Sequence, residues 1–225
     1  MSQPRPQDRR DFDEIVVFTG DLVGSSKLSS DDLAKAMRVL ELASREVARS
    51  FGSGVGRAAH FSAFRGDGWQ CVGPRPAHAL RGALVMRAHL AALGRPFDTR
   101  VSVGLGSGWI IDQPGLDVAS GPAFELSGHG LDGIGQNRRF AISWEHPPRE
   151  APLIRAIFAL ADEISRKWTP GQARVFARLL TESPRPSQEK LAAALGITQQ
   201  SVAEHLTGGG DWALQDALLA VEEPR

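Results

Sequence analysis

The sequence predicts a mixed α/β chain, in which an α+β domain is followed by an all-helical tail. Over the first two thirds, segments with strand-like patterns alternate with segments of helical spacing, in the order β-α-β-β-α-β and then α-β. After "EHPPREAP", only helical patterns remain. The first order fits an antiparallel sheet with helices on one face.

Each element follows from a local pattern. Residues 15–18 are a continuous apolar run of the kind that is covered on both faces. "SSDD" supplies an N-terminal cap before a helix, and Gly66-Asp67-Gly68 is a hairpin turn. The predicted elements are the strand 15–18, the helix 31–49, the hairpin turning at 66–68, the helix 77–93, the strand 98–111, the short helix 121–134 and the strand 138–144. The tail helices are expected at 153–168, 169–180, 187–196, 198–206 and 211–223.

Composition excludes several classes of protein. Lys+Arg and Asp+Glu both number 26 in 225 residues, so no global field attracts the chain to nucleic acid or membrane, and any DNA contact must be local. The single cysteine, Cys71, excludes an intrachain disulfide and a cysteine-based metal cluster. With no run of about 20 apolar residues and no signal-peptide pattern, a cytoplasmic location is expected.

Two carboxylates occupy glycine-flanked turns. Asp21 follows the first strand, and Asp67 lies in the hairpin. In a βαββαβ arrangement these strands can be neighbours, and two adjacent carboxylates repel unless they are protonated or bridged by a cation. Magnesium prefers such oxygen ligands, and the N–H groups of Gly24, Ser25 and Ser26 would complement phosphate. The alternative is local: backbone N–H groups cap Asp21, and the GDG sequence is only a turn.

Basic and aromatic residues flank these turns. Arg65 precedes Gly66, and Arg138 and Arg139 follow a glycine-rich bend, so all three are candidates to bind phosphate. The alternative for each arginine is a solvated surface residue. Trp69 is either a core residue or a wall of a ligand pocket beside Asp67.

These motifs resemble known proteins. "FTGDLVGSS" resembles the metal-binding strand end of class III nucleotidyl cyclases, "GDGW" their second metal-binding hairpin, and "TRVSVGLGSG" a later strand. The resemblance implies a ferredoxin-like, cyclase-type domain that binds Mg²⁺ or Mn²⁺ with a nucleotide, with Asp21 and Asp67 as the metal ligands.

A narrower resemblance covers most of the chain. "GDGWQ", "GPAF" and the tail segments "WTPGQ", "LAAALGITQQSV" and "DW" are similar to SatD-like proteins, bacterial relatives that join such a domain to a C-terminal helix-turn-helix. It implies a cyclase-like domain at 11–148, a linker or signalling helix at 149–168 and a DNA-binding domain at 169–225. Residues 1–10 are polar and rich in proline, so a disordered leader is expected there.

The chain departs from the cyclase pattern at the groups that perform catalysis. The resemblance places an Asn and, four residues later, a phosphate-stabilising Arg where this chain has Glu125 and His129, and Ala63 replaces the purine-selecting lysine. Glu125 carries the wrong charge for that role, and His129 lacks the permanent bidentate charge of arginine. Cyclase activity is therefore not expected. Nucleotide binding is still expected, with Glu125 and His129 as walls of the pocket.

The tail has the pattern of a helix-turn-helix. Gly196 suits the left-handed turn between two helices, and a recognition helix would present its N-terminal residues to base edges. The candidate DNA-binding residues are Thr198, Gln199, Gln200 and Ser201, with Arg185 and Lys190 for phosphates. The alternative is a helical bundle that only resembles a DNA reader, because residues 165–225 carry seven basic and seven acidic residues.

The sequence thus favours a homodimeric, DNA-binding transcription regulator whose degenerate cyclase-like domain senses a nucleotide or a cyclic mono- or dinucleotide. Apolar faces of the helices at 151–168 and 212–223 would form the dimer. The main alternative is a metal-dependent enzyme, a divergent cyclase or phosphohydrolase that uses Asp21 and Asp67. A third is a protein-interaction module with neither activity.

Overall fold

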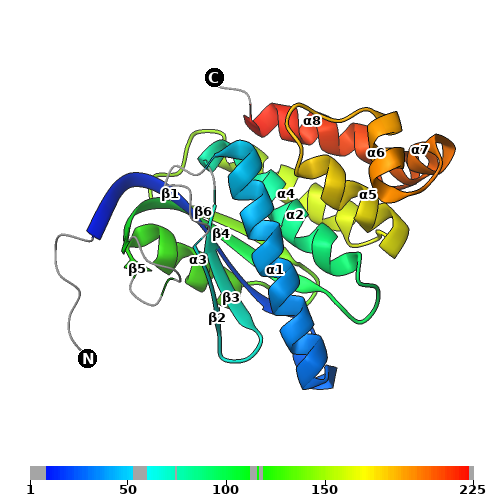
Figure 1. The fold of residues 1–225 in the computed structure, drawn as a ribbon. Coiled ribbons are helices and arrows are strands. Elements are labelled where there is room, and N and C mark those ends of the chain that lie inside the picture. The colour runs from blue at the N-terminus through cyan, green and yellow to red at the C-terminus, as the bar shows by residue number, and fades with distance from the viewer. Residues whose placement is uncertain (1–8, 53–59, 74, 112–115, 117–118, 223–225) are drawn as a thin grey trace.

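Over the described residues, the sheet has six strands. The computed structural model describes residues 9–52, 60–73, 75–111, 116 and 119–222. The strands are β1 (Arg9–Leu22), β2 (Phe61–Phe64), β3 (Gly68–Val72), β4 (Thr99–Ile111), β5 (Ala119–Ser120) and β6 (Phe140–Trp144). Their order is β2-β3-β1-β4-β5 with antiparallel neighbours, and β6 pairs with β4 in parallel (Figure 1). The sheet is therefore antiparallel except at β6.

Helices cover both faces of the sheet, so the prediction of helices on one face is wrong. On β1, Val16 and Phe18 belong to the large core that includes α1 (Ser30–Phe51) and α2 (Ala79–Ala91). Their neighbours Ile15 and Val17 pack with Phe124 of α3 (Pro122–Asp132) on the opposite face (Figure 1). Side chains alternate between faces along a strand, so an uninterrupted apolar run needs cover on both.

Close approach of α3 depends on glycine. A Cβ added at Gly104 of β4 would lie 2.1 Å from the backbone oxygen of Ala123, a distance that no side chain tolerates. Gly104 therefore permits the backbone of α3 to lie directly on the sheet.

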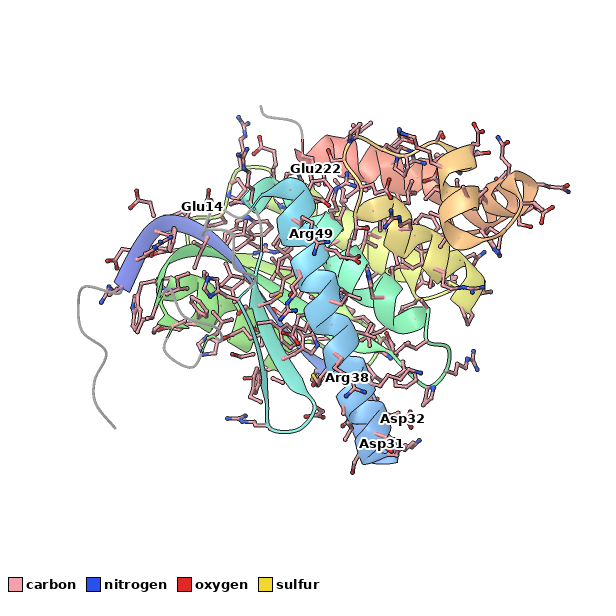
Figure 2. The ribbon with its side chains drawn as sticks, in the orientation of Figure 1. Glu14, Asp31, Asp32, Arg38, Arg49 and Glu222 are labelled. Carbon is pink, nitrogen blue, oxygen red and sulfur yellow. The ribbon has the colours of Figure 1, made fainter. Side chains whose placement is uncertain are left out.

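Helix α1 begins one residue before its predicted start and runs two residues beyond its predicted end at Arg49. The Ser29 side chain accepts a hydrogen bond from the Asp32 N–H at 3.1 Å and caps the helix. Figure 2 shows Asp31 and Asp32 at the N-terminal end and Arg49 near the other end, the arrangement that complements the helix dipole.

The tail is helical throughout its described part and packs against the α+β region. Its helices are α4 (Ala151–Ser165), α5 (Pro170–Leu180), α6 (Gln188–Leu195), α7 (Gln199–Gly208) and α8 (Asp211–Glu222). Helix α2 contacts α4, α5 and α8, and ten of its 13 residues are buried. One hydrophobic cluster runs from β1 to α8. Among the described residues, no helix is long and apolar enough to cross a membrane.

Several elements differ in extent from their prediction, above all β1, which was predicted at 15–18 and spans Arg9–Leu22. Strand β1 begins at Arg9, inside the predicted leader, because Arg9 and Arg10 pair with Ile111 and Ile110 of β4. Short 3-10 helices form at Ser25–Lys27 and Pro76–His78, and β5 was not predicted. Residues 1–8 of the predicted leader and most of the "FGSGVGR" helix break lie outside the described residues.

Candidate ligand cleft

Strand pairing brings the two predicted carboxylates to one end of the sheet. Asp21 of β1 lies opposite Gly68 of β3 in the register, and the Leu22 N–H donates to the Asp67 backbone oxygen at 3.1 Å. The predicted neighbourhood of the first strand and the hairpin is therefore confirmed. It follows from the order β3-β1-β4, which places the opening strand at the centre of the sheet.

Each carboxylate has a protein partner. Arg100, opposite Asp21 on β4, donates from Nε to Asp21 Oδ1 at 2.8 Å and from Nη2 to Oδ2. The Asp67 Oδ2 accepts a hydrogen bond from Ser25 Oγ at 2.5 Å. Asp21 is thus held by a bidentate guanidinium rather than by local backbone N–H groups.

Two cavities meet at these carboxylates. A cavity of about 360 Å³ lies on the hairpin side, where Phe64, Arg65 and Asp132 contribute to its wall. A cavity of about 440 Å³ lies on the other side, and its lining includes Gly24, Ser25, Ser26, Arg100 and Arg139. Asp21 and Asp67 line both cavities. We call the two cavities together the ligand cleft.

The cleft has a cationic centre surrounded by acids. The pKa of Arg100 is raised, first by its hydrogen bonds to Asp21 and further by the negative charges of Asp21, Asp132 and Asp67. Arg100 therefore remains charged at every pH at which the protein is folded.

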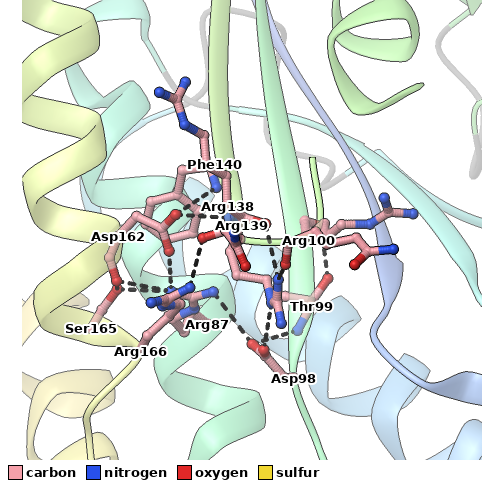
Figure 3. Close-up of polar contacts among 12 residues, drawn as sticks. Arg87, Asp98, Thr99, Arg100, Arg138, Arg139, Phe140, Asp162, Ser165 and Arg166 are labelled. Carbon is pink, nitrogen blue, oxygen red and sulfur yellow. Dashed lines mark hydrogen bonds and ion pairs between the residues drawn. The ribbon is translucent and has the colours of Figure 1, made fainter. Parts of the chain in front are cut away.

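The two other arginines of the cleft differ in exposure and in their contacts. Arg65 is exposed and lies in the hairpin turn with φ +54°. It lines the hairpin-side cavity together with Asp67. Arg139 donates from Nε to Asp98 Oδ2 at 2.8 Å while it lines the second cavity (Figure 3). Arg138 lies apart from both, in a cavity of about 190 Å³ beside Arg155.

A polar floor beneath the hairpin-side cavity was not predicted. Thr19 Oγ1 is 2.6 Å from Ser127 Oγ and accepts from Gln70 Nε2 at 2.8 Å. Thr19 and Gln70 both line that cavity. Neither residue has a sequence signal of its own, because the network joins strands and a helix that lie far apart in the chain.

Three further predicted ligand-binding residues lie outside the cleft, as Arg138 does. Trp69 is fully buried, donates from Nε1 to Thr99 Oγ1 at 3.0 Å and stacks on Phe61, so it is a core residue. Glu125 and His129 are exposed on α3 and line neither cavity of the cleft. Their helix instead contributes Gly128, Leu131 and Asp132.

The cleft as folded does not fit a divalent cation. Both oxygens of Asp21 are engaged by Arg100, and one oxygen of Asp67 by Ser25. Within the part of the chain that the structure describes, no group of three or more His, Cys, Asp or Glu side chains could hold a metal ion. The assignment of Asp21 and Asp67 as metal ligands therefore stays a prediction, which rests on their adjacency and on the resemblance.

The candidate DNA-binding residues Thr198, Gln199 and Gln200 lie on the surface at the start of α7. Gly196 ends α6 with φ +65°, and Thr198 caps α7 by accepting from the Ser201 N–H at 3.1 Å. Thr198, Gln199 and Gln200 are exposed. Lys190 is exposed on α6, whereas Arg185 is paired with Asp211 at 2.6 Å. The helices thus form where they were predicted, and their role in binding DNA stays a prediction.

Comparison with known proteins gives only distant similarity. No protein-family model and no curated protein matches the chain. The crystal structure of the guanylyl cyclase Cya2 is 18% identical, with a TM-score of 0.42, over 60% of this chain and 76% of that chain. The non-canonical dimeric guanylyl cyclase domain of the RhoGC fusion protein from the aquatic fungus Blastocladiella emersonii is 17% identical, with a TM-score of 0.38, over 60% and 81%. These values are too low to transfer an activity or a residue's role to this chain.

Proposed function

We propose that the ligand cleft binds a nucleotide and that the chain is a ligand-responsive regulator. The observation that supports binding is the convergence of three arginines, three carboxylates and a short run of small residues around the ends of β1, β3 and β4. The two cavities are of a size typical of small-molecule sites.

The two halves of the cleft suit different parts of a nucleotide. The half that contains Gly24–Ser26 and Arg139 offers backbone N–H groups, hydroxyls and a guanidinium, which suit phosphate oxygens. The half that contains Phe64, Gln70 and Leu131 offers an aromatic ring, an amide and an apolar side chain, which suit a base. Arg65 lines the cavity on the hairpin side, beside the residues that suit a base.

A polar network supports the regulatory part of the proposal (Figure 3). Asp98 accepts from Arg139 at 2.8 Å and from Arg87 at 3.4 Å, and Arg87 donates to Asp162 of α4 at 2.8 Å. The Arg139 N–H also donates to Asp162 at 2.7 Å. A phosphate that takes the Arg139 guanidinium would compete with Asp98, so occupancy of the cleft would change contacts at α4.

In this proposal the helical tail binds DNA, and ligand binding in the cleft changes that DNA binding. Support comes from the pair α6 and α7, whose connecting turn presents Gln199 and Gln200 to solvent at a helix N-terminus. Because Arg178 and Arg185 are paired with acids, contacts to phosphate would be few, and binding would depend on two copies of the chain. Exposed Leu153 and Leu160 on α4 offer an apolar face for that pairing.

The first test is thermal stabilisation of the full chain by nucleoside triphosphates, cyclic mononucleotides and cyclic dinucleotides. A ligand that binds only the folded state must raise the melting temperature. We expect at least one nucleotide to do so, and Arg139→Ala to reduce the shift. The absence of any shift would contradict nucleotide binding. Turnover of a triphosphate would instead support the metal-dependent enzyme.

The second test addresses DNA. Selection from a random duplex library, followed by anisotropy at several salt concentrations, should give a bound sequence that Gln199→Ala and Gln200→Ala no longer discriminate. Light scattering should give the mass of a dimer. Failure to enrich any sequence would contradict the DNA-binding role and leave the cleft unaffected.

A further inference from the structure

Arg100 is a permanent cation in direct contact with Asp21. Both oxygens of Asp21 accept hydrogen bonds from this guanidinium, in a bidentate arrangement. A carboxylate whose two oxygens both face a guanidinium cannot at the same time coordinate a divalent ion in that direction.

The pair is fixed by the sheet rather than by chance contact of two flexible side chains. Asp21 and Arg100 are directly opposite each other in the antiparallel register of β1 and β4. Two residues earlier on β1, Thr19 lies opposite Ser102, so the pair is continuous with the regular ladder. The Arg100 Nη1 also donates to the Ile134 backbone oxygen at 3.4 Å, which holds the guanidinium from the side of α3.

The surroundings favour a permanent cation at this point. Asp21, Asp67 and Asp132 all place negative charge near Arg100, and its side chain is two thirds buried, with an exposed fraction of 33%. Three acids without Arg100 would repel one another, so the guanidinium performs the neutralising task that a metal ion performs in a carboxylate site.

We infer that Arg100 is the built-in counter-cation of the ligand cleft, so that this cleft binds the phosphate groups of a nucleotide without a divalent metal ion. The inference rests on the proposed ligand binding for its second half only. Its first half, that Arg100 excludes a divalent ion from Asp21, holds or fails independently of any nucleotide. It departs from the metal-ligand roles that the resemblance implies for Asp21 and Asp67.

The decisive experiment measures Mn²⁺ binding to the full chain by electron paramagnetic resonance. Wild type should bind no Mn²⁺ in the cleft at free concentrations up to about 1 mM, because its carboxylate is already neutralised. Arg100→Gln should free Asp21 and tighten Mn²⁺ binding by at least about tenfold. The double variant Arg100→Gln with Asp21→Asn should lose that gain.

Two matched variants complete the series. Arg100→Lys keeps the positive charge and should stay like wild type. Arg45→Gln removes another arginine that pairs with an acid, Glu41 on α1, and should not create a Mn²⁺ site. Should Arg100→Gln fail to fold, judged by circular dichroism, Arg100→Met keeps the apolar stem and replaces it in the series.

The outcomes separate this inference from the proposed function. Micromolar Mn²⁺ binding by wild type that is lost in Asp21→Asn would overturn the inference, whatever the nucleotide panel shows. Failure of a folded Arg100 variant to gain Mn²⁺ would overturn it as well. If a nucleotide stabilises the protein, the shift should be the same in EDTA and in Mg²⁺, and a shift that requires Mg²⁺ would refute metal-free binding. A silent nucleotide panel beside the expected Mn²⁺ results would contradict the proposed function alone.

Discussion

Arg87 is the most enclosed charged residue of the network in Figure 3, with 1% of its surface exposed. It donates to the Asp162 carboxylate at 2.8 Å and to Ser165 Oγ at 3.1 Å. Burial lowers its pKa, while the charges of Asp98 and Asp162 oppose that effect. The guanidinium is therefore stable in the interior only because acids meet it there.

Asp162→Ala should destabilise the protein by about 3–5 kcal/mol, because it leaves the Arg87 charge buried without its main partner. It also removes the acceptor of the Arg139 N–H. Urea unfolding followed by circular dichroism measures the change. Glu163→Ala is the matched control, since the neighbouring Glu163 pairs with Arg166 and Lys167 at the surface. Equal effects of the two variants would show that the buried network does not stabilise the fold.

His78 predicts a pH dependence of stability. Desolvation by burial lowers its pKa below the ordinary value of 6.5, an effect opposed by Glu222 and reinforced by Arg81 and Arg75. The unfolded chain therefore takes up a proton at a higher pH than the folded one, so stability falls as the pH drops below about 6.5. His78→Gln should flatten this fall in urea unfolding between about pH 7.5 and pH 5. An unchanged slope in His78→Gln would contradict the assignment.

For single residues, the sequence identifies the acidic residues of the cleft better than the side chains that pair with them. Asp21 and Asp67 were recognisable as a pair, because both lie in glycine-flanked turns of strands that the predicted order can place side by side. Arg100 was not, because its meeting with Asp21 depends on the register of β1 against β4, which no local pattern specifies. Trp69 was ambiguous for a similar reason: its neighbours in sequence face the cleft, while alternation along β3 turns its own ring into the core.

Helix α6 and the turn after it show how one glycine defines the end of an element. Gly196 has φ +65° and donates from its N–H to the Ala192 oxygen, and a Cβ added there would meet nothing within 4 Å. The demand for glycine is therefore conformational and not steric.

Gly196→Ala should cost about 1 kcal/mol of stability from backbone strain, and Gly196→Asn should cost less. Gly128→Ala offers the contrast, because Gly128 lies inside α3, has ordinary helical backbone and equally open surroundings. That variant should stabilise the protein by about 0.5–1 kcal/mol. Chemical unfolding of the three variants measures these changes in the free energy of unfolding. Stabilisation by Gly196→Ala would contradict the left-handed turn.

Most elements were predictable because each has a local start or stop signal, such as Ser29 before α1 and Gly196 after α6. The short β5 and the parallel pairing of β6 were not, since they depend on where α3 places the chain relative to β4. The second covered face of the sheet was signalled by the apolar run at 15–18, yet the order of elements alone suggested one face.

Across the whole molecule, the tail and the sheet share one core. Helix α2 lies between the sheet and helices α4, α5 and α8 and is buried against both. Trp168, stacked on Phe176 at 4.4 Å, and Val16 of β1 belong to the same hydrophobic cluster. The division at residues 148 and 168 remains a prediction about function, because the apolar packing is continuous across it.

We expect a single cooperative unfolding transition of the full chain. Burial of one continuous apolar core couples the stability of all elements that line it. Native-state hydrogen exchange should therefore show the most protected amides of β1 and of α5 opening with the same urea dependence. Opening of α5–α8 at lower urea, with the sheet still protected, would contradict this expectation.

The position of α2 also restricts how such a chain can be recombined. A helix with one apolar stripe could exchange its neighbours freely, but a helix that is apolar on nearly every side needs a specific surface on each. The helical tail therefore cannot be exchanged for an unrelated helical segment without changes at its contacts with α2. Any graft that keeps the sheet must either bring a surface complementary to α2 or replace its outward apolar residues with polar ones.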